Sequence, residues 1–221
     1  MKKRTGKVAE QAVSYGGTDF VNQVFFHSSE KMPEIQDESI RLAVTSPPYW
    51  NVKDYTKDGH QRKTVSEKKS GQIGDIHDYD DYLRAMLPVW KECYRVLKSG
   101  GKLCINVPLM PIQKKQMSTH SARDIVDIAA GIQRVILHDT KFYLYDIVVW
   151  NRTNPMKGLM FGSYPYPPNF YIQNTIEFIT IYIKDGDTEK APPEMRETSK
   201  LSQAEWLEYT KQVWNIPIPS R

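Results

Sequence analysis

The stretch Ser46-Pro47-Pro48-Tyr49 directly follows the apolar run Leu42–Val44 and Thr45, and its residue types suggest chemistry. Proline fixes its own φ, lacks an N–H and keeps the preceding residue extended. The carbonyls here therefore form a stiff array of acceptors that no N–H within the stretch can satisfy. Such acceptors suit an exocyclic amino group, and the Tyr49 ring offers a stacking face, which is how an extruded nucleobase is held. The alternative is a diproline turn with packed aromatic residues.

Alternating strands and helices must position this stretch. Period-2 and β-branched patterns predict strands, whereas apolar residues at helical spacing predict helices. The pattern is that of an α/β sheet with helices on its faces, in which ligands bind outside the carboxyl ends of strands. Residues 45–50 lie at such an end. The expected strands are 23–28, 39–46, 102–108, 142–150 and 175–183, and the expected helices are 78–97, ended by Gly100–Gly101, 121–138 and one near 202–213.

Composition limits the class of protein. The 221 residues suffice for a sizeable core, and 30 basic against 26 acidic residues give a net charge of +4, which suits an anionic partner. Cys93 and Cys104 show neither metal-ligand spacing nor a disulfide framework, so we expect a reducing, cytoplasmic location. No apolar run approaches the length that spans a membrane, and we expect no signal peptide.

The motif "TSPPYW" (45–50) is followed by "GQIGDIHDYDDYL" and then by "ECYRVLKSGGKLCINV". In this order the segments resemble the β-type amino-DNA methyltransferases, which methylate the exocyclic nitrogen of cytosine (N4) or adenine (N6) using S-adenosylmethionine. The resemblance covers residues from about 24 to 186. It implies an α/β, Rossmann-like S-adenosylmethionine-dependent methyltransferase sheet with a DNA-facing loop region, in a site-specific enzyme of a restriction-modification system.

The resemblance implies a catalytic role for Ser46, Pro47, Pro48 and Tyr49. Ser46 Oγ and the Pro47 carbonyl would each accept an N–H bond from the target amino group, which localises the nitrogen lone pair for attack on the sulfonium methyl. Orientation of the reactants is the main resource in such a reaction. Tyr49 would stack on the base, which must first be flipped out of double-stranded DNA at a cost of a few kcal/mol.

Further roles are carried over from the same resemblance. The expected cofactor contacts are Thr45, Ser46, Asn106 and His27, although the family often has an acidic residue where His27 stands. Trp50 either finishes the base pocket or packs beneath the loop. The acidic residues near the start of the first helix favour capping over metal binding, and we expect no metal site. The expected DNA-facing residues are Trp50, Arg152, Lys157, Tyr164 and Tyr166.

Two features set the finer expectations. Serine at position 46 favours N4-cytosine over N6-adenine as the target. The β-type family also carries a glycine-rich Phe-x-Gly-x-Gly cofactor motif downstream of these segments, and this chain has none. We therefore expect an incomplete sheet, with residues 1–22 as a basic tail, 23–186 as the catalytic portion and 187–221 as a polar segment.

The missing motif leaves the assembly and the class of function open. A second polypeptide, or a missing C-terminal half, would supply it, and a homodimer is an alternative assembly. A non-catalytic DNA-binding or regulatory module with the same fold is the alternative function. The intact "SPPY" favours the enzyme, because a module that no longer binds cofactor has no need of that cluster.

Overall fold

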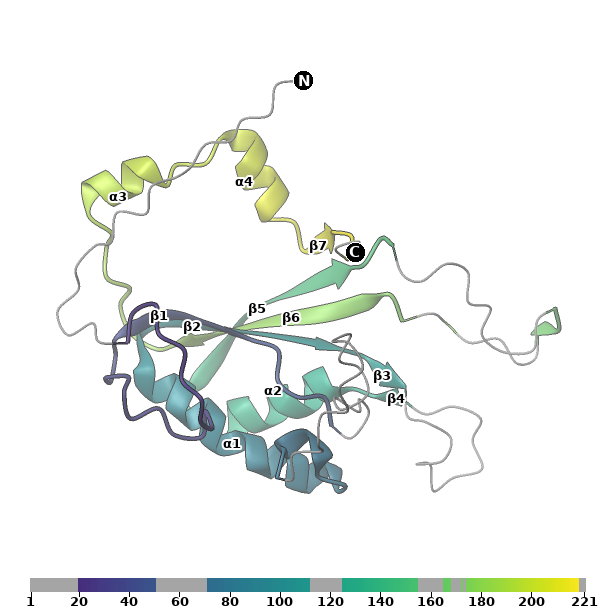
Figure 1. Ribbon diagram of the computed structural model, residues 1–221. Helices are drawn as coiled ribbons and strands as arrows, with labels where there is room; N and C mark the ends of the chain where they lie inside the picture. Colours follow the sequence, from purple (N-terminus) through teal and green to yellow (C-terminus); the bar gives the residue numbers. More distant parts are fainter. Residues whose placement is uncertain are drawn as a thin grey trace, which may run out of the picture.

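The computed structural model describes residues 20–50, 71–111, 125–154, 165–167, 172 and 174–218. Strands and helices alternate over most of this part of the chain (Figure 1). The elements are β1 (Ile40–Thr45), η1 (Ile73–Asp75), α1 (Tyr79–Val96), β2 (Leu97–Pro108), β3 (Met110–Pro111), β4 (Ile125–Val126), α2 (Ile128–Asp139), β5 (Phe142–Asn151), β6 (Ile176–Lys184), α3 (Pro193–Thr198), α4 (Gln203–Tyr209) and β7 (Val213–Asn215).

The main sheet has the strand order β1-β2-β6-β5-β7. β1 pairs in parallel with β2, β6 lies antiparallel to both β2 and β5, and β7 returns parallel to β5. β3 and β4 form a separate short pair. The α/β class expected from the sequence is confirmed, and β1 is the terminal strand of the sheet.

Helices α1 and α2 cover one face of this sheet, whereas α3 and α4 lie on its other side (Figure 1). The Asp78 side chain accepts the Asp81 backbone N–H at 2.8 Å and begins α1, which confirms the expected capping. α3 and α4 bury none of their residues. The core therefore lies between the α1–α2 layer and the facing side chains of β2 and β6, and its largest fully buried members include Trp90, Tyr82, Tyr182, Leu83, Leu103, Ile105, Ile128, Ile132 and Ile136.

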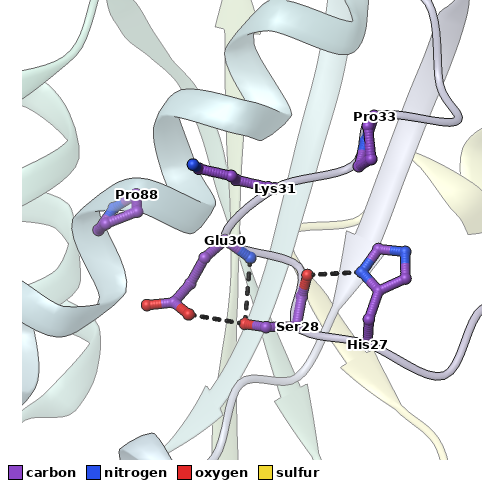
Figure 2. Close-up of a pocket in the computed structure, with 6 residues that line it drawn as sticks. All are labelled: His27, Ser28, Glu30, Lys31, Pro33 and Pro88. Carbon is purple, nitrogen blue, oxygen red and sulfur yellow. Dashed lines mark hydrogen bonds between the residues drawn. The ribbon is translucent and has the colours of Figure 1, made fainter.

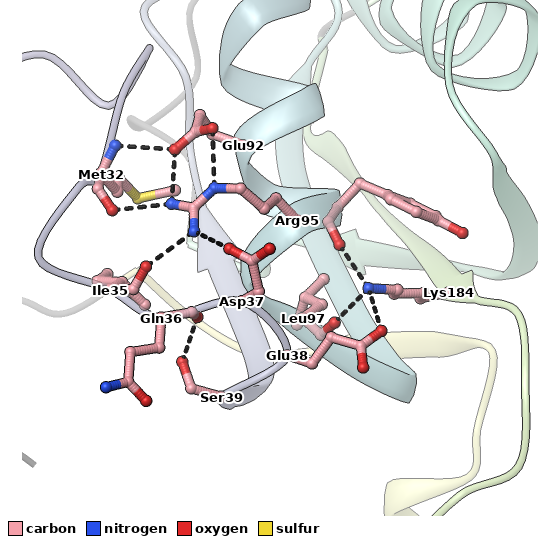
Figure 3. Close-up of polar contacts among 11 residues, drawn as sticks. Met32, Ile35, Gln36, Asp37, Glu38, Ser39, Glu92, Arg95, Leu97 and Lys184 are labelled. Atoms are coloured by element: carbon pink, nitrogen blue, oxygen red, sulfur yellow. Dashed lines mark hydrogen bonds and ion pairs between the residues drawn. The ribbon is translucent and has the colours of Figure 1, made fainter. Parts of the chain in front are cut away.

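The junction between α1 and β2 contains no loop, because the helix ends at Val96 and the strand begins at Leu97. The buried Lys184 ammonium fixes this junction (Figure 3). It donates to the Tyr94 carbonyl at 3.0 Å and to the Leu97 carbonyl at 2.8 Å, and it pairs with Glu38 at 3.0 Å. A cation at the carboxyl end of a helix also complements the helix dipole.

A second cluster, around Arg95, ties the segment before β1 to α1 (Figure 3). The Arg95 guanidinium donates to Glu92 and Asp37 and to the carbonyls of Met32 and Ile35. The hydrogen bond from Arg95 holds the pKa of the Glu92 carboxyl below its usual value. These charge-assisted bonds fix the direction from which the chain enters β1.

Two expectations about local structure were wrong. Residues 23–28 form no strand, because a strand needs a hydrogen-bonded neighbour and the described residues provide none for this segment. The side chains of Val24 and Phe26 in this segment are 75% and 96% exposed. Gly100–Gly101 lie inside β2 rather than at the end of α1. Gly100 has a φ of +69°, and a Cβ there would lie 2.1 Å from Thr188 Oγ1, so glycine serves a close approach instead.

Other boundaries moved less. The second helix begins at Ile128, while 112–124 lie outside the described residues. The expected helix near 202–213 is confirmed as α4. No helix in the described ranges combines the length and the apolar character needed to cross a bilayer.

The outer edge of β1 has no hydrogen-bonded neighbour among the described residues. Leu42 and Val44, which alternate with the inward-facing Ala43, are 54% and 71% exposed. Parallel strands are ordinarily covered on both faces, and long open edges are normally protected. Strand β1 therefore has the side chains of an internal strand at an edge position.

Candidate active site

Ser46 follows the carboxyl end of β1, and its hydroxyl joins two elements. Oγ donates to the Asn106 backbone carbonyl at 3.1 Å and lies 2.9 Å from the Tyr49 hydroxyl. A hydroxyl has one proton, so when Ser46 gives it to Asn106, Tyr49 must be the donor in the second bond. Because an oxygen of this kind has two lone pairs, Ser46 Oγ keeps one for an incoming N–H group.

A hydrogen bond from helix α1 holds the diproline segment in place. The buried Tyr82 hydroxyl donates to the Pro48 carbonyl at 2.7 Å, and Pro47 is itself buried. The Pro48 carbonyl is therefore already engaged inside the protein. Ser46 Oγ is therefore a candidate acceptor for a ligand, and the role of the Pro47 carbonyl stays a prediction.

Trp50 packs beneath this segment. Its ring meets Tyr79 edge-on at a centroid distance of 5.1 Å, and the Tyr79 ring lies 6.1 Å from that of Tyr82. Burial raises the pKa of Tyr79 to about 12, so its hydroxyl stays protonated. Of the two roles expected for Trp50, this geometry matches the packing role, while a contact of Trp50 with DNA stays a prediction.

A polar chain runs from Asn106 across the sheet. Asn106 Nδ2 donates to Glu177 Oε2 at 2.6 Å, and Glu177 Oε1 lies 3.2 Å from Arg152 Nη1. Arg152 also donates to the carbonyls of Thr175 at 3.1 Å and Asn174 at 2.6 Å. This polar chain, of which Glu177 is the buried member, links the end of β5 to Asn106, whose carbonyl accepts the Ser46 hydroxyl.

The predicted cofactor residues do not all meet. Thr45 pairs with Ile105 in the β1–β2 ladder, which places it beside Ser46 and Asn106. His27 lies elsewhere, in an open hollow of about 520 Å³ between its loop and Pro88 of α1 (Figure 2). There His27 bonds Glu34 at 3.0 Å and the Ser28 carbonyl at 2.9 Å, and the Ser28 bond is the main cause that raises its pKa.

The residues expected to face DNA are only partly described. Lys157 and Tyr164 lie outside the described residues, and Tyr166 is 71% exposed. Arg152 points inward to Glu177, which leaves little of its charge for a phosphate. Its role toward DNA stays a prediction with no structural contact in its favour.

Two residues of this region were not expected from the sequence. Tyr82 was assigned only to the apolar face of a helix, and Glu177 was treated as part of a strand. An acidic residue amid the apolar run 176–183 was the available signal for Glu177, because a carboxylate in a buried strand needs a partner. Across the ranges that the structure describes, no three His, Cys, Asp or Glu side chains gather as a metal site requires.

Comparison with known proteins identifies the family. The model of the DNA methylase family N6_N4_Mtase matches residues 40–221. The chain belongs to this DNA methylase family. The methylase is 29% identical over 212 residues to the type II methyltransferase M.MjaI of Methanocaldococcus jannaschii, covering 88% of this chain and 66% of the relative. It is 26% identical over 191 residues to M.MthZI of Methanothermobacter thermautotrophicus, covering 85% of this chain and 51% of that relative.

Among solved structures, the methylase resembles TTHA0409, a putative DNA modification methylase from Thermus thermophilus. The TM-score is 0.60 at 28% identity, over 83% of this chain and 62% of that one. The same protein complexed with S-adenosyl-L-methionine gives a TM-score of 0.58 at 27% identity, with 82% of this chain and 62% of that chain covered. The expected fold, an incomplete methyltransferase sheet, is confirmed. This methylase spans about half to two thirds of the length of its first two relatives.

Proposed function

We propose that this chain is the catalytic portion of a DNA methyltransferase that methylates an exocyclic amino nitrogen of a flipped-out base in double-stranded DNA. The observation that carries the proposal is the commitment of the Ser46 proton to the Asn106 carbonyl, which makes Ser46 Oγ an acceptor at the carboxyl end of β1. Family membership agrees with this chemistry. By analogy with its type II relatives, we place the enzyme in a restriction-modification system.

In this proposal the residues of the chain orient the substrate. Ser46 Oγ and the Pro47 carbonyl accept the two N–H groups of the amino nitrogen, which aligns its lone pair. Tyr82, through Pro48, and Asn106, through Ser46, hold these acceptors in place. Tyr49 presents its ring to the base while its hydroxyl bonds Ser46. Such positioning is worth several kcal/mol of a reaction barrier.

We assign S-adenosylmethionine as the methyl donor. It supplies an electrophilic methyl group on a sulfonium centre. The structure offers one feature that fits its N–H donors: Asn106 Oδ1 is excluded from solvent and has no hydrogen-bond partner among the described residues. Asn106, with Thr45 and Ser46, would hold the cofactor, whereas nothing described connects the His27 hollow to these three residues.

We propose cytosine N4 as the target, on the basis of serine at position 46. The alternative, adenine N6, predicts a different product from the same site. Hydrolysis of modified DNA and mass spectrometry of the nucleosides distinguishes them. N4-methylcytosine is expected; N6-methyladenine alone would overturn the choice of base, and DNA binding without any methylation would favour the non-catalytic module.

We also propose that a second polypeptide, or a C-terminal half that follows this sequence, completes the sheet at β1, and we argue the case of the second polypeptide. Leu42 and Val44 expose apolar surface along the open edge, and Val24 and Phe26 expose more on the preceding segment. The relatives contain a further third or more of their length that this chain does not match. A polypeptide that adds a parallel strand beside β1 would cover this surface next to Ser46.

Binding of the polypeptide encoded beside this chain tests that proposal. Size-exclusion chromatography with light scattering should show a one-to-one complex, and Val44→Lys should abolish it. Leu137→Lys, on the remote surface of α2 and 40% exposed in the wild type, is the matched control and should leave it intact. A homodimer through the same edge, or a monodisperse 221-residue chain that methylates DNA alone at ordinary rates, would refute the proposal.

A further inference from the structure

We propose that Glu177 is a positioning residue that orients the Asn106 side chain for an N–H donor of the bound ligand. The inference rests on the proposed function and adds to it a residue that touches neither the base nor the methyl donor. It concerns the polar chain Arg152–Glu177–Asn106, which ends at the carbonyl partner of Ser46.

Glu177 determines which way the Asn106 side-chain amide points. An amide side chain can be turned by half a rotation, which exchanges its donor and its acceptor. Glu177, paired with Arg152, presents carboxylate oxygens that only accept hydrogen bonds. The bond of 2.6 Å therefore selects the orientation in which Nδ2 faces Glu177 and Oδ1 points away from it.

The Glu177 carboxylate is held at this position by an ion pair with Arg152. Glu177 is buried on β6, where a single charge would be costly, and the Arg152 guanidinium offsets that cost. Arg152 is in turn fixed by the carbonyls of Thr175 and Asn174. An apolar residue at position 177 would stabilise the fold as well as this buried ion pair does. The ion pair is therefore better explained by its effect on the orientation of Asn106 than by a contribution to stability.

This orientation of the amide leaves Asn106 Oδ1 as an acceptor for a ligand. Asn106 Oδ1 is shielded from solvent, and no described residue bonds it. A buried carbonyl oxygen without a partner is costly, and such atoms are commonly satisfied by a ligand or water. A carbonyl oxygen accepts from an N–H or O–H group, and the primary amino groups of the methyl donor and of the target base are donors of this kind.

A double-mutant cycle tests the proposal in the assembly that methylates DNA. Affinity for S-adenosylmethionine is measured by calorimetric titration, and base flipping by fluorescence of DNA with 2-aminopurine beside the target. Glu177→Gln, whose amide can donate as well as accept, lets Asn106 turn and should weaken one of the two by about 3- to 10-fold. The arm that changes identifies the source of the amino group.

The cycle separates orientation from simple structural support. In an Asn106→Ala background, Glu177→Gln should have no further effect on that affinity, because its influence passes through Asn106. Glu189→Gln, at the exposed ion pair with Arg41, is the matched control and should change neither affinity. Additive losses from Glu177→Gln and Asn106→Ala would overturn the proposal.

Two further outcomes keep the test decisive. If Glu177→Gln fails to fold by circular dichroism, Asn106→Ala alone decides, since unchanged affinity for both ligands would refute the role of Oδ1. If the wild-type protein methylates DNA and Glu177→Gln matches it in both S-adenosylmethionine affinity and base flipping, this inference is refuted while the proposed function stands. Wild-type protein that neither binds the methyl donor nor modifies DNA refutes the proposed function.

Discussion

Removing one hydroxyl group tests how α1 holds the diproline segment. Tyr82 is fully buried, and its hydroxyl donates to the Pro48 carbonyl at 2.7 Å. Tyr82→Phe keeps the ring in the core and deletes this bond. A typical hydrogen bond contributes about 0.5–1.5 kcal/mol net, so the free energy of unfolding should fall by about that amount.

The thermal shift follows from the size of the chain. For a domain of this length, 1 kcal/mol corresponds to about 2–4 °C, which gives a fall in the unfolding midpoint of about 1–6 °C. Thermal unfolding followed by circular dichroism measures it. Tyr209→Phe, at a 58% exposed site on α4, is the matched control and should stay within about 0.5 kcal/mol of wild type.

The same variant should affect function more than stability. With Pro48 released, the acceptors at Ser46 and Pro47 are held less firmly, and misplacement by an ångström can cost about 100-fold in rate. We expect the methylation rate at saturating DNA to fall while DNA binding changes little. A Tyr82→Phe enzyme with the midpoint and the rate of the Tyr209→Phe control would refute the view that Tyr82 anchors the segment.

The remaining predictions concern single side chains. Tyr49→Ala should weaken base binding by about 1–3 kcal/mol through lost stacking. Tyr49→Phe removes the hydroxyl that bonds Ser46 but keeps the stacking face, so it should weaken base binding less. Equal losses in 2-aminopurine fluorescence for the two variants would contradict the stacking role. Arg95 lowers the pKa of Glu92, so the contribution of the Glu92 carboxylate to the free energy of unfolding is fully present above the ordinary carboxyl pKa. This contribution is lost as the pH falls through the lowered pKa. Glu92→Gln should therefore lower the free energy of unfolding by about 1–3 kcal/mol at pH 7 in denaturant titrations, with the difference from wild type shrinking in acid. Burial raises the pKa of Cys93 to about 11, so maleimide should label the less buried Cys104 first, as mass spectrometry of the native protein would show.

The sequence predicted the elements whose signal is local. The helix from 78 to 97 carried its cap and its apolar face within one stretch, and α1 agrees within a residue at each end. The strand before Ser46 was correct for the same reason. The segment 23–28 has an apolar pattern like theirs and failed, because a strand also depends on a neighbour that its own residues do not encode.

The site was predicted in part for a related reason. The motif at 45–50 is contiguous, so its residues were found together. Tyr82 and Glu177 join it only through the packing of α1 and the register of β6 against β2, which pairs Asn106 with Ile179 and places Glu177 diagonally across. Contacts of that kind depend on strand order, and no spacing within one segment reveals them.

The regularly paired part of β2, from Lys102 to Pro108, limits how the chain length can vary. Side chains alternate sides along a regularly paired strand, so one residue inserted directly after Lys102 would turn each later side chain of β2 to the opposite face. Asn106 would then point at the helices, and Ile105 toward the opposite face of the sheet. The stretch from Lys102 to Ile105 is paired residue by residue with β1 on one side and with β6 on the other, so it cannot absorb such a change, whereas the irregular stretch between Leu97 and Lys102 can. Homologues should therefore tolerate insertions in other connections but keep the interval from Lys102 to Ile105 constant in length.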